Sequence, residues 1–221
     1  MGESATALQR LDEITRRLRT ECPWDREQDE RSIVPHTVEE AYELADAAQS
    51  GDDRKLLDEL GDVLFQVYFL SLLMEERGAG DLAAVADHCR NKLIRRHPHV
   101  FGDVEAADAS EVRRNWDEIK RSEEGRGGEL FAGVPETLPG LLYAQKVLRR
   151  ARSDGRAERL RSEADRAAEL LASEPERDAR FEAVGDLLLA AVALARELRV
   201  DPELAVRAAA DRLRREMEAG A

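Results

Sequence analysis

Acidic residues with metal-ligand chemistry lie close together in two neighbouring stretches of this 221-residue chain. Glu39, Glu40 and Glu43 form the first set, and Glu59 and Asp62 form the second. On helices, the first set falls within one arc of about 100° and the second set shares one narrow stripe. Two antiparallel helices joined by a short turn would bring both sets together. Carboxylate oxygens in such number suit Mg²⁺ or Mn²⁺, so the spacing indicates a cation site.

A simpler interpretation of the same carboxylates stays open. Glu40 can complete a capping box with Thr37, and the other acids can face water. The next helix favours the interpretation as a cation site, because apolar residues from Val63 to Met74 point in every direction and predict burial on all sides. Burying carboxylates without a partner is costly. Zinc is disfavoured, since no His or Cys pair has ligand spacing.

Basic and aromatic residues further along the chain have the chemistry to bind a nucleotide. Lys92, Arg95 and Arg96 lie within about one helical turn, where they can grip a polyphosphate or form a solvated helix end. Trp116 and Lys120 are also one turn apart. The indole can stack on a base while the amine holds a phosphate, and packing of the indole into the core is the alternative.

Trp24 and His36 lie in a stretch that is predicted to be irregular. Trp24, beside Pro23, is either a stacking platform or a loop anchor. His36 follows Pro35 and is interpreted as a loop histidine.

Helical periodicity and capping residues predict about nine helices and no strands. Thr37, Ser110 and Asp201 are the predicted N-caps of three of these helices, and Gly51 is predicted to break the helix that Thr37 opens. The predicted irregular stretch covers residues 21–36. The first predicted helices span about residues 4–20, 37–50, 54–77 and 81–96. The short turn at Gly51 is therefore expected to pair the two acidic helices.

Composition excludes several functional classes. Charged residues make up 37% of the chain and the net charge is −13, which disfavours nucleic-acid binding. Residues 1–125 carry −12 of that charge and residues 126–221 carry −1. Only two cysteines occur, and no secretion signal is recognised at the start, which predicts a cytoplasmic protein. The longest apolar stretch is too short for a bilayer, which needs roughly 18 to 20 residues, so no membrane contact is expected.

A glycine-rich run at residues 124–128 is the best linker candidate. We predict a helical domain at 1–125 with the acidic site, a linker at 126–137 and a second helical domain at 138–221. Gly61 and Asp62 recur as Gly185 and Asp186, each pair opening an apolar helix. The chain is therefore interpreted as a tandem duplication of one helical unit.

Together, these motifs resemble the MazG-type nucleoside triphosphate pyrophosphohydrolases, an all-α superfamily. The segments 39–43 and 59–62 are similar to the family's EExxE and ExxD motifs. The flanking matches are 22–25 with Gln28, 92–101, Trp116 with Ile119 and Lys120, and 133–135 with Leu138 and Pro139. The resemblance covers about residues 8–150 strongly and the remainder weakly.

The resemblance implies a dimeric helical bundle that hydrolyses a nucleoside triphosphate to the monophosphate and pyrophosphate, with Mg²⁺ as cofactor and Mn²⁺ as a substitute. It also implies a role in cleansing the nucleotide pool. It assigns the ion to Glu40, Glu43, Glu59 and Asp62, and the orientation or deprotonation of water to Glu39. It assigns nucleotide binding to Lys92, Arg95, Arg96, Trp116, Lys120, His36 and Lys55.

The second repeat departs from this pattern. Ala183 stands where the family has the Glu of ExxD, and the upstream residues 163–169 form no clear EExxE motif. We therefore expect a degenerate second repeat that holds no Mg²⁺ and serves as a scaffold or dimer surface.

Two other functions stay open on the sequence. One is a catalytically inactive helical interaction or regulatory module. The other is a pyrophosphohydrolase of a narrower substrate, such as phosphoribosyl-ATP or an alarmone.

Overall fold

The computed structural model describes residues 2–123, 131, 134–151, 156–173 and 176–220. These residues form helices and contain no strand, which confirms the all-α prediction. The helices are α1 (Glu3–Glu21), α2 (Pro23–Glu27), α3 (Glu30–Ser50), α4 (Asp53–Glu76), α5 (Leu82–Arg96), α6 (Pro98–Phe101), α7 (Ala109–Glu123), α8 (Gly140–Arg150), α9 (Arg156–Ala172), α10 (Arg177–Glu197) and α11 (Pro202–Ala219).

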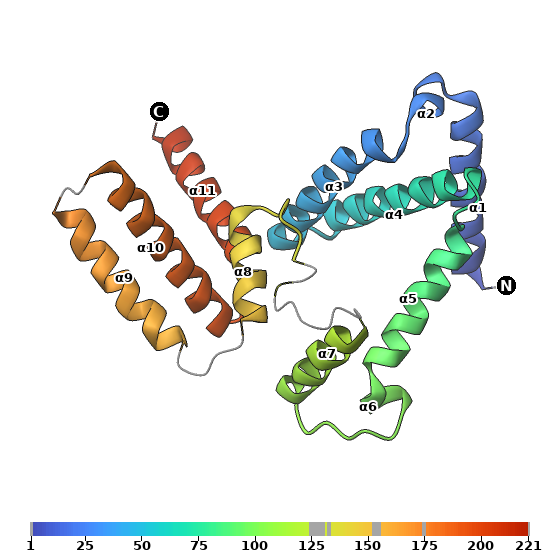
Figure 1. Ribbon diagram of the computed structural model, residues 1–221. Helices are drawn as coiled ribbons and strands as arrows, with labels where there is room; N and C mark the ends of the chain where they lie inside the picture. The colour runs from blue at the N-terminus through green and yellow to red at the C-terminus, as the bar shows by residue number, and fades with distance from the viewer. Residues whose placement is uncertain (1, 124–130, 132–133, 152–155, 174–175, 221) are drawn as a thin grey trace. The chain divides into compact units, whose positions relative to one another are not determined.

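The chain divides into two compact units, Met1–Lys120 and Arg121–Ala221 (Figure 1). Most of the predicted linker at 126–137, and the predicted boundary at residue 125, lie outside the described residues. Within the described helices, none is long and apolar enough to cross a membrane.

Helix α3 begins about two turns before the predicted start. Asp29 is its N-cap: the carboxylate accepts hydrogen bonds from the backbone N–H of Arg31 at 2.9 Å and Ser32 at 2.8 Å, and Ser32 completes a capping box. The prediction of Thr37 as N-cap was therefore wrong, and Pro35 lies inside the helix. The Thr37 hydroxyl donates instead to Gln66 Oε1 on α4 at 3.3 Å.

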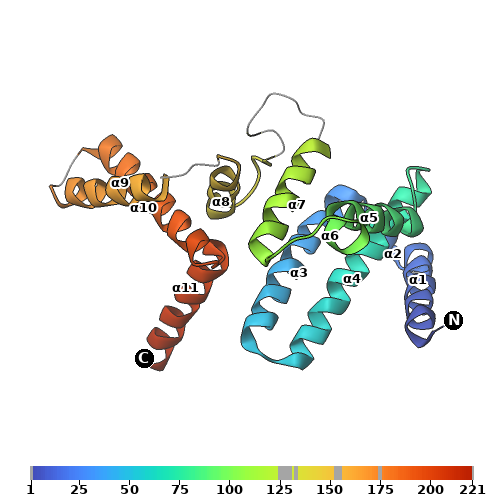
Figure 2. The same cartoon turned by 90° about the horizontal axis from the view of Figure 1, so that it is seen from below.

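The turn between α3 and α4 is as predicted. Gly51 adopts the left-handed conformation with φ +70°, which ends α3. The Asp52 carboxylate then accepts hydrogen bonds from the backbone of Arg54 at 3.0 Å and Lys55 at 3.3 Å, so α4 starts at once. The two helices consequently run antiparallel and side by side in both views (Figures 1 and 2).

The core of the first unit lies between α3 and the second half of α4. Ile33, Phe69 and Leu73 are 2%, 0% and 5% exposed and form one apolar cluster. The predicted burial of 63–74 on all sides was wrong for its first half, because Leu64 and Val67 remain exposed in the single chain.

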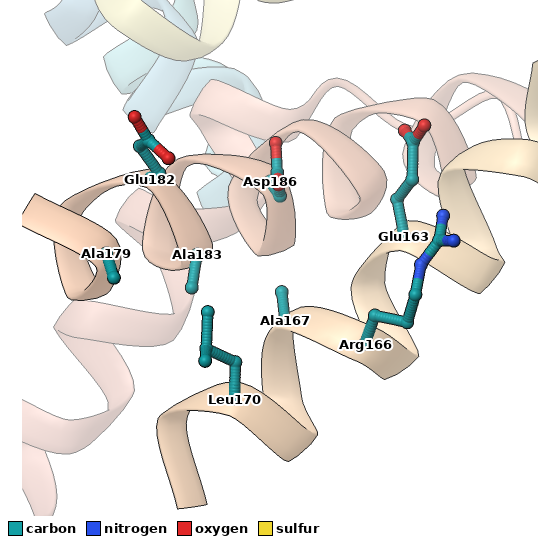
Figure 3. A pocket seen from close by; sticks show the side chains of 8 residues that line it. All are labelled: Glu163, Arg166, Ala167, Leu170, Ala179, Glu182, Ala183 and Asp186. Carbon is teal, nitrogen blue, oxygen red and sulfur yellow. The ribbon is translucent and has the colours of Figure 1, made fainter. Parts of the chain in front are cut away.

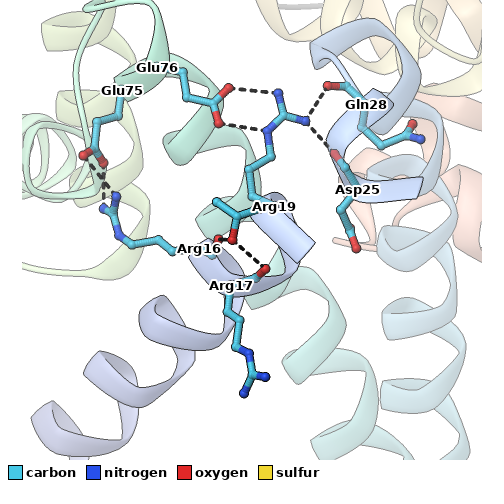
Figure 4. Close-up of polar contacts among 8 residues, drawn as sticks. Arg16, Arg17, Arg19, Asp25, Gln28, Glu75 and Glu76 are labelled. Carbon is cyan, nitrogen blue, oxygen red and sulfur yellow. Dashed lines mark hydrogen bonds and ion pairs between the residues drawn. The ribbon is translucent and has the colours of Figure 1, made fainter. Parts of the chain in front are cut away.

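An arginine on α1 ties together three elements of the first unit (Figure 4). The Arg19 guanidinium binds both carboxylate oxygens of Glu76 on α4, at 2.8 and 2.9 Å, and also donates to the backbone carbonyls of Asp25 and Gln28. These bonds hold α2, which lies in the stretch predicted to be irregular, against the end of α4. A parallel pair between Arg16 and Glu75 reinforces the α1–α4 contact.

In the second unit, α9 and α10 form the main antiparallel pair, and α8 and α11 also contact α10. Leu148 on α8 and Val192 on α10 form the buried cluster. Asp201 caps α11 with Pro202 in the first turn, as predicted.

Ser110, by contrast, does not cap α7, because the Asp108 carboxylate accepts hydrogen bonds from the backbone N–H of Ser110 and Glu111.

Candidate cation and nucleotide site

Three carboxylates converge where α3 and α4 lie side by side. Glu40 and Glu43 project from adjacent turns of α3, and Glu59 projects from α4. Each offers one oxygen, and the three oxygens lie within 4.8 Å of one another. The Gly51 turn fixes this convergence, because it sets which turns of the two helices face each other.

The acidic cluster, defined as Glu40, Glu43 and Glu59, is electrostatically unfavourable by itself. Desolvation raises the pKa of Glu40, and repulsion from Asp62 and Glu43 adds to the effect. Desolvation also raises the pKa of Glu59, and repulsion from Glu43 and Asp62 again contributes. Moreover, Glu59 Oε2 is buried without a hydrogen-bond partner. An all-oxygen donor set with an unsatisfied buried oxygen fits a hard divalent cation such as Mg²⁺ or Mn²⁺.

The other two acids lie beside the cluster. Asp62 on α4 adds to the repulsion on both Glu40 and Glu59, beyond the larger effect of desolvation on the pKa of each, although its oxygen is not among the three that converge. The Glu39 side chain is 69% exposed, and its Oε2 lies 3.2 Å from Nδ1 of His36, one turn earlier on α3. Glu39 therefore sits on the outer edge of the cluster.

Helix α2 adds an aromatic neighbour to this edge. The Trp24 ring meets the His36 ring edge-on, with centroids 5.8 Å apart, and Trp24 is 51% exposed. Gln28 donates to the Trp24 carbonyl at 2.9 Å, and Arg19 fixes the same short helix. The sequence did not reveal this proximity, because the segment was predicted to be irregular. The proline before Trp24, at the first helical position, was the available signal.

The predicted nucleotide-binding residues form a second group on α5 and α7. Lys92, Arg95 and Arg96 lie in the last turns of α5, as predicted. The Arg96 guanidinium stacks over the Trp116 ring at 5.5 Å. His97 also contacts that ring edge-on at 4.8 Å. Trp116 is therefore half-buried against basic and imidazole side chains rather than in an apolar core.

The last two predicted residues lie on other helices. Lys120 lies one turn beyond Trp116 on α7 and is partly exposed. Lys55 is exposed in the first turn of α4, one turn before Glu59.

Comparison with known protein families matches residues 28–101 to the MazG nucleotide pyrophosphohydrolase domain. This match covers the acidic cluster and the basic end of α5. The chain is 36% identical over 222 residues to the nucleoside triphosphate pyrophosphohydrolase of Escherichia coli K12, an alignment that covers 94% of this chain and 84% of that protein.

A second relative, from Thermotoga maritima, carries the description nucleoside triphosphate pyrophosphohydrolase/pyrophosphatase MazG. It is 36% identical over 216 residues, which is 95% of this chain and 83% of the relative. The similarity to these relatives extends through both units, and the matched family domain spans the acidic residues, so this chain belongs to the MazG nucleotide pyrophosphohydrolase family.

Proposed function

We propose that this protein hydrolyses nucleoside triphosphates to nucleoside monophosphates and pyrophosphate in a reaction that depends on a divalent cation. The observation that carries the proposal is the convergence of Glu40, Glu43 and Glu59, with oxygens within 4.8 Å, inside the segment that matches the family domain. The names of the relatives describe the same activity.

The acidic residues have distinct roles in this proposal. Glu40, Glu43, Glu59 and Asp62 hold Mg²⁺, or Mn²⁺ in its place. When bound, the ion would offset the charges of the carboxylates and the triphosphate and act as a Lewis acid at phosphorus. Glu39 orients or deprotonates the attacking water, because its carboxylate is exposed at the edge of the cluster and hydrogen-bonded to His36 at 3.2 Å.

The basic group binds the nucleotide. Lys92, Arg95 and Arg96 supply positive charge to the phosphates of the nucleotide, in a protein whose net charge is −13. Trp116 contacts the base and also holds the Arg96 guanidinium in place through their stacking contact. Lys120 contacts a phosphate from the next turn, and His36 and Lys55 contribute from the acidic edge.

We further propose that the domain at residues 1–125 carries this reaction, and that 126–137 link it to a scaffold domain at 138–221. The protein acts as a homodimer in this proposal. Its support is an apolar stripe of Leu57, Leu60, Leu64 and Val67 on α4, with exposures from 36% to 73%. Such a contiguous row is typical of a protein–protein contact.

The activity is tested by incubating the protein with Mg²⁺ and a panel of triphosphates that includes deaminated and oxidised bases, and by measuring pyrophosphate directly. Pyrophosphate and monophosphate are expected in equal amounts, with faster release from damaged nucleotides if the protein cleanses the pool. Release of orthophosphate, or no release with any triphosphate, would contradict the proposal. A chelator control is included.

The dimer is tested by light scattering on Leu57→Asp/Leu60→Asp, which is expected to have half the mass of the native protein. Asp53→Asn, in the exposed first turn of the same helix, serves as control and is expected to keep the native mass. A monomeric native protein would refute the dimer.

A further inference from the structure

Residue positions in the hairpin α9–α10 correspond to those in the hairpin α3–α4 at one constant difference in residue number. The spacing from Glu59 through Gly61 to Asp62 equals the spacing from Ala183 through Gly185 to Asp186. The same offset carries Glu43 to Ala167, although the loop between α9 and α10 is longer than the turn at Gly51. The two hairpins can therefore be compared position by position.

The positions that correspond to the acidic cluster have all lost their carboxylates. Its three residues, Glu40, Glu43 and Glu59, correspond to Ala164, Ala167 and Ala183. All three are alanines. The two neighbouring acids are retained, since Glu39 corresponds to Glu163 and Asp62 corresponds to Asp186.

A cavity of about 390 Å³ lies between α9 and α10 at this place. Its lining residues are Glu163, Arg166, Ala167, Leu170, Ala179, Glu182, Ala183 and Asp186. In Figure 3 the alanines and Leu170 point into the space between the helices, while the carboxylates stand at its rim. One water molecule needs about 10–15 Å³ of such volume, so the space between the helices is large enough for several water molecules.

The cavity floor offers no ligand to a cation. Ala167 and Ala183 are only 5% and 3% exposed, so methyl groups occupy the positions where the first hairpin presents carboxylates. Arg166 places a positive charge at the rim, next to Glu163 (Figure 3). The rim carries three carboxylates, those of Glu163, Glu182 and Asp186. They are not among the acidic groups whose oxygens converge within 4.8 Å in the described part of the chain, so they do not form a ligand set for a divalent ion.

We infer that the α9–α10 hairpin is a vacated cation site, with alanine at all three positions that correspond to the acidic cluster, and that among the described residues the cation is held in the α3–α4 hairpin. Two of these alanines, Ala167 and Ala183, line the cavity. The inference rests on the proposed cation site at α3–α4. Its consequence is that glutamates at the three alanine positions would create a cation site in the second unit.

The test is Mn²⁺ titration of the full-length protein, with free Mn²⁺ measured by electron paramagnetic resonance. Glu43→Gln/Glu59→Gln is expected to weaken Mn²⁺ binding at least about 10-fold. Adding Ala164→Glu, Ala167→Glu and Ala183→Glu to that variant is expected to restore binding. The matched control adds three glutamates at exposed alanines outside the cavity lining, namely Ala168→Glu, Ala172→Glu and Ala191→Glu, and is not expected to restore it.

The possible failures are distinguishable. A restored variant that is folded by circular dichroism but does not bind Mn²⁺ overturns the inference, as does restoration by the control glutamates. Binding that persists in Glu43→Gln/Glu59→Gln and disappears when Asp186→Asn is added also overturns it. Persistent binding that Asp186→Asn leaves unchanged refutes the proposed α3–α4 site instead. If the triple substitution prevents folding, the pair Ala164→Glu/Ala183→Glu is measured by the same criteria.

Discussion

The hairpins α3–α4 and α9–α10 share a design and differ in chemistry. Both are antiparallel helix pairs with an aspartate after a glycine near the start of the apolar helix. In the first, three carboxylates converge and one oxygen is buried without a partner. In the second, buried alanines occupy two of the corresponding positions. The pairing of the helices therefore does not depend on the acidic residues, because apolar faces and not carboxylates hold each hairpin together.

The same comparison separates functional residues from stabilising ones. Desolvation, with added repulsion among the acidic groups, raises the pKa of Glu40 and Glu59, so the first hairpin is destabilised where its proposed function lies. The second hairpin has alanines at those positions. Three experiments test this contrast, and a fourth tests how α2 is anchored in the first unit.

The largest effect is expected on catalysis. Glu59→Gln should reduce the rate of pyrophosphate release at least about 100-fold, because it removes a charged ligand from the acidic cluster. The corresponding change in the second unit, Asp186→Asn, should leave the rate within about twofold. Equal losses in the two variants would erase the functional difference between the hairpins.

The next effect concerns the anchor of α2. Arg19→Ala should lower the free energy of unfolding by about 2 kcal/mol, because the guanidinium is only 17% exposed and bonds Glu76 and two carbonyls. Arg17→Ala, on the same helix, removes an exposed pair with Glu21 and should cost about 0.3 kcal/mol. Urea unfolding followed by tryptophan fluorescence measures both, since Trp24 and Trp116 lie in the first unit. Similar midpoints would show that α2 is not anchored through Arg19.

A pH dependence follows from the raised pKa values of Glu40 and Glu59, whose ordinary value is 4.5. The folded chain holds protons on these groups more tightly than the unfolded chain does. Without metal, the first unit should therefore be most stabilised by these groups near and below the ordinary value of 4.5, and it should lose that stability as the pH rises through their raised pKa. The affinity for Mn²⁺ should fall as the pH is lowered through the same interval, because protons compete for the carboxylates. Melting temperatures and Mn²⁺ titrations at several pH values test this, and a melting temperature that does not fall as the pH rises above 4.5 would contradict it.

The smallest effect is expected on the stability of the metal-free protein. Glu59→Gln should raise the melting temperature slightly in the presence of a chelator, because it removes one charge from a repulsive cluster. Asp186→Asn should leave it unchanged. A decrease for Glu59→Gln would show that the carboxylate contributes a favourable contact that the amide cannot replace.

Much of the fold could be predicted from the sequence. The breaks at Gly51 and Asp52, the cap at Asp201 and the helical class depend on contacts within a few residues, so local patterns were sufficient. The start of α3 was missed, because residues 21–36 were interpreted as irregular and the capping box at Asp29 was overlooked. The exposure of Leu64 and Val67 was also missed, because an apolar residue in the sequence does not reveal whether a neighbour covers it.

The candidate site shows the same division. The sequence by itself determined which residues could bind a cation and that the second repeat lacks a ligand at Ala183, because residue type and helical spacing carry that information. Only the tertiary structure decided that Glu40, Glu43 and Glu59 share one point, that Arg96 stacks on Trp116, and that a cavity lies over Ala167 and Ala183. These facts depend on how two helices face each other across a turn, and that geometry is set by packing between residues distant in sequence.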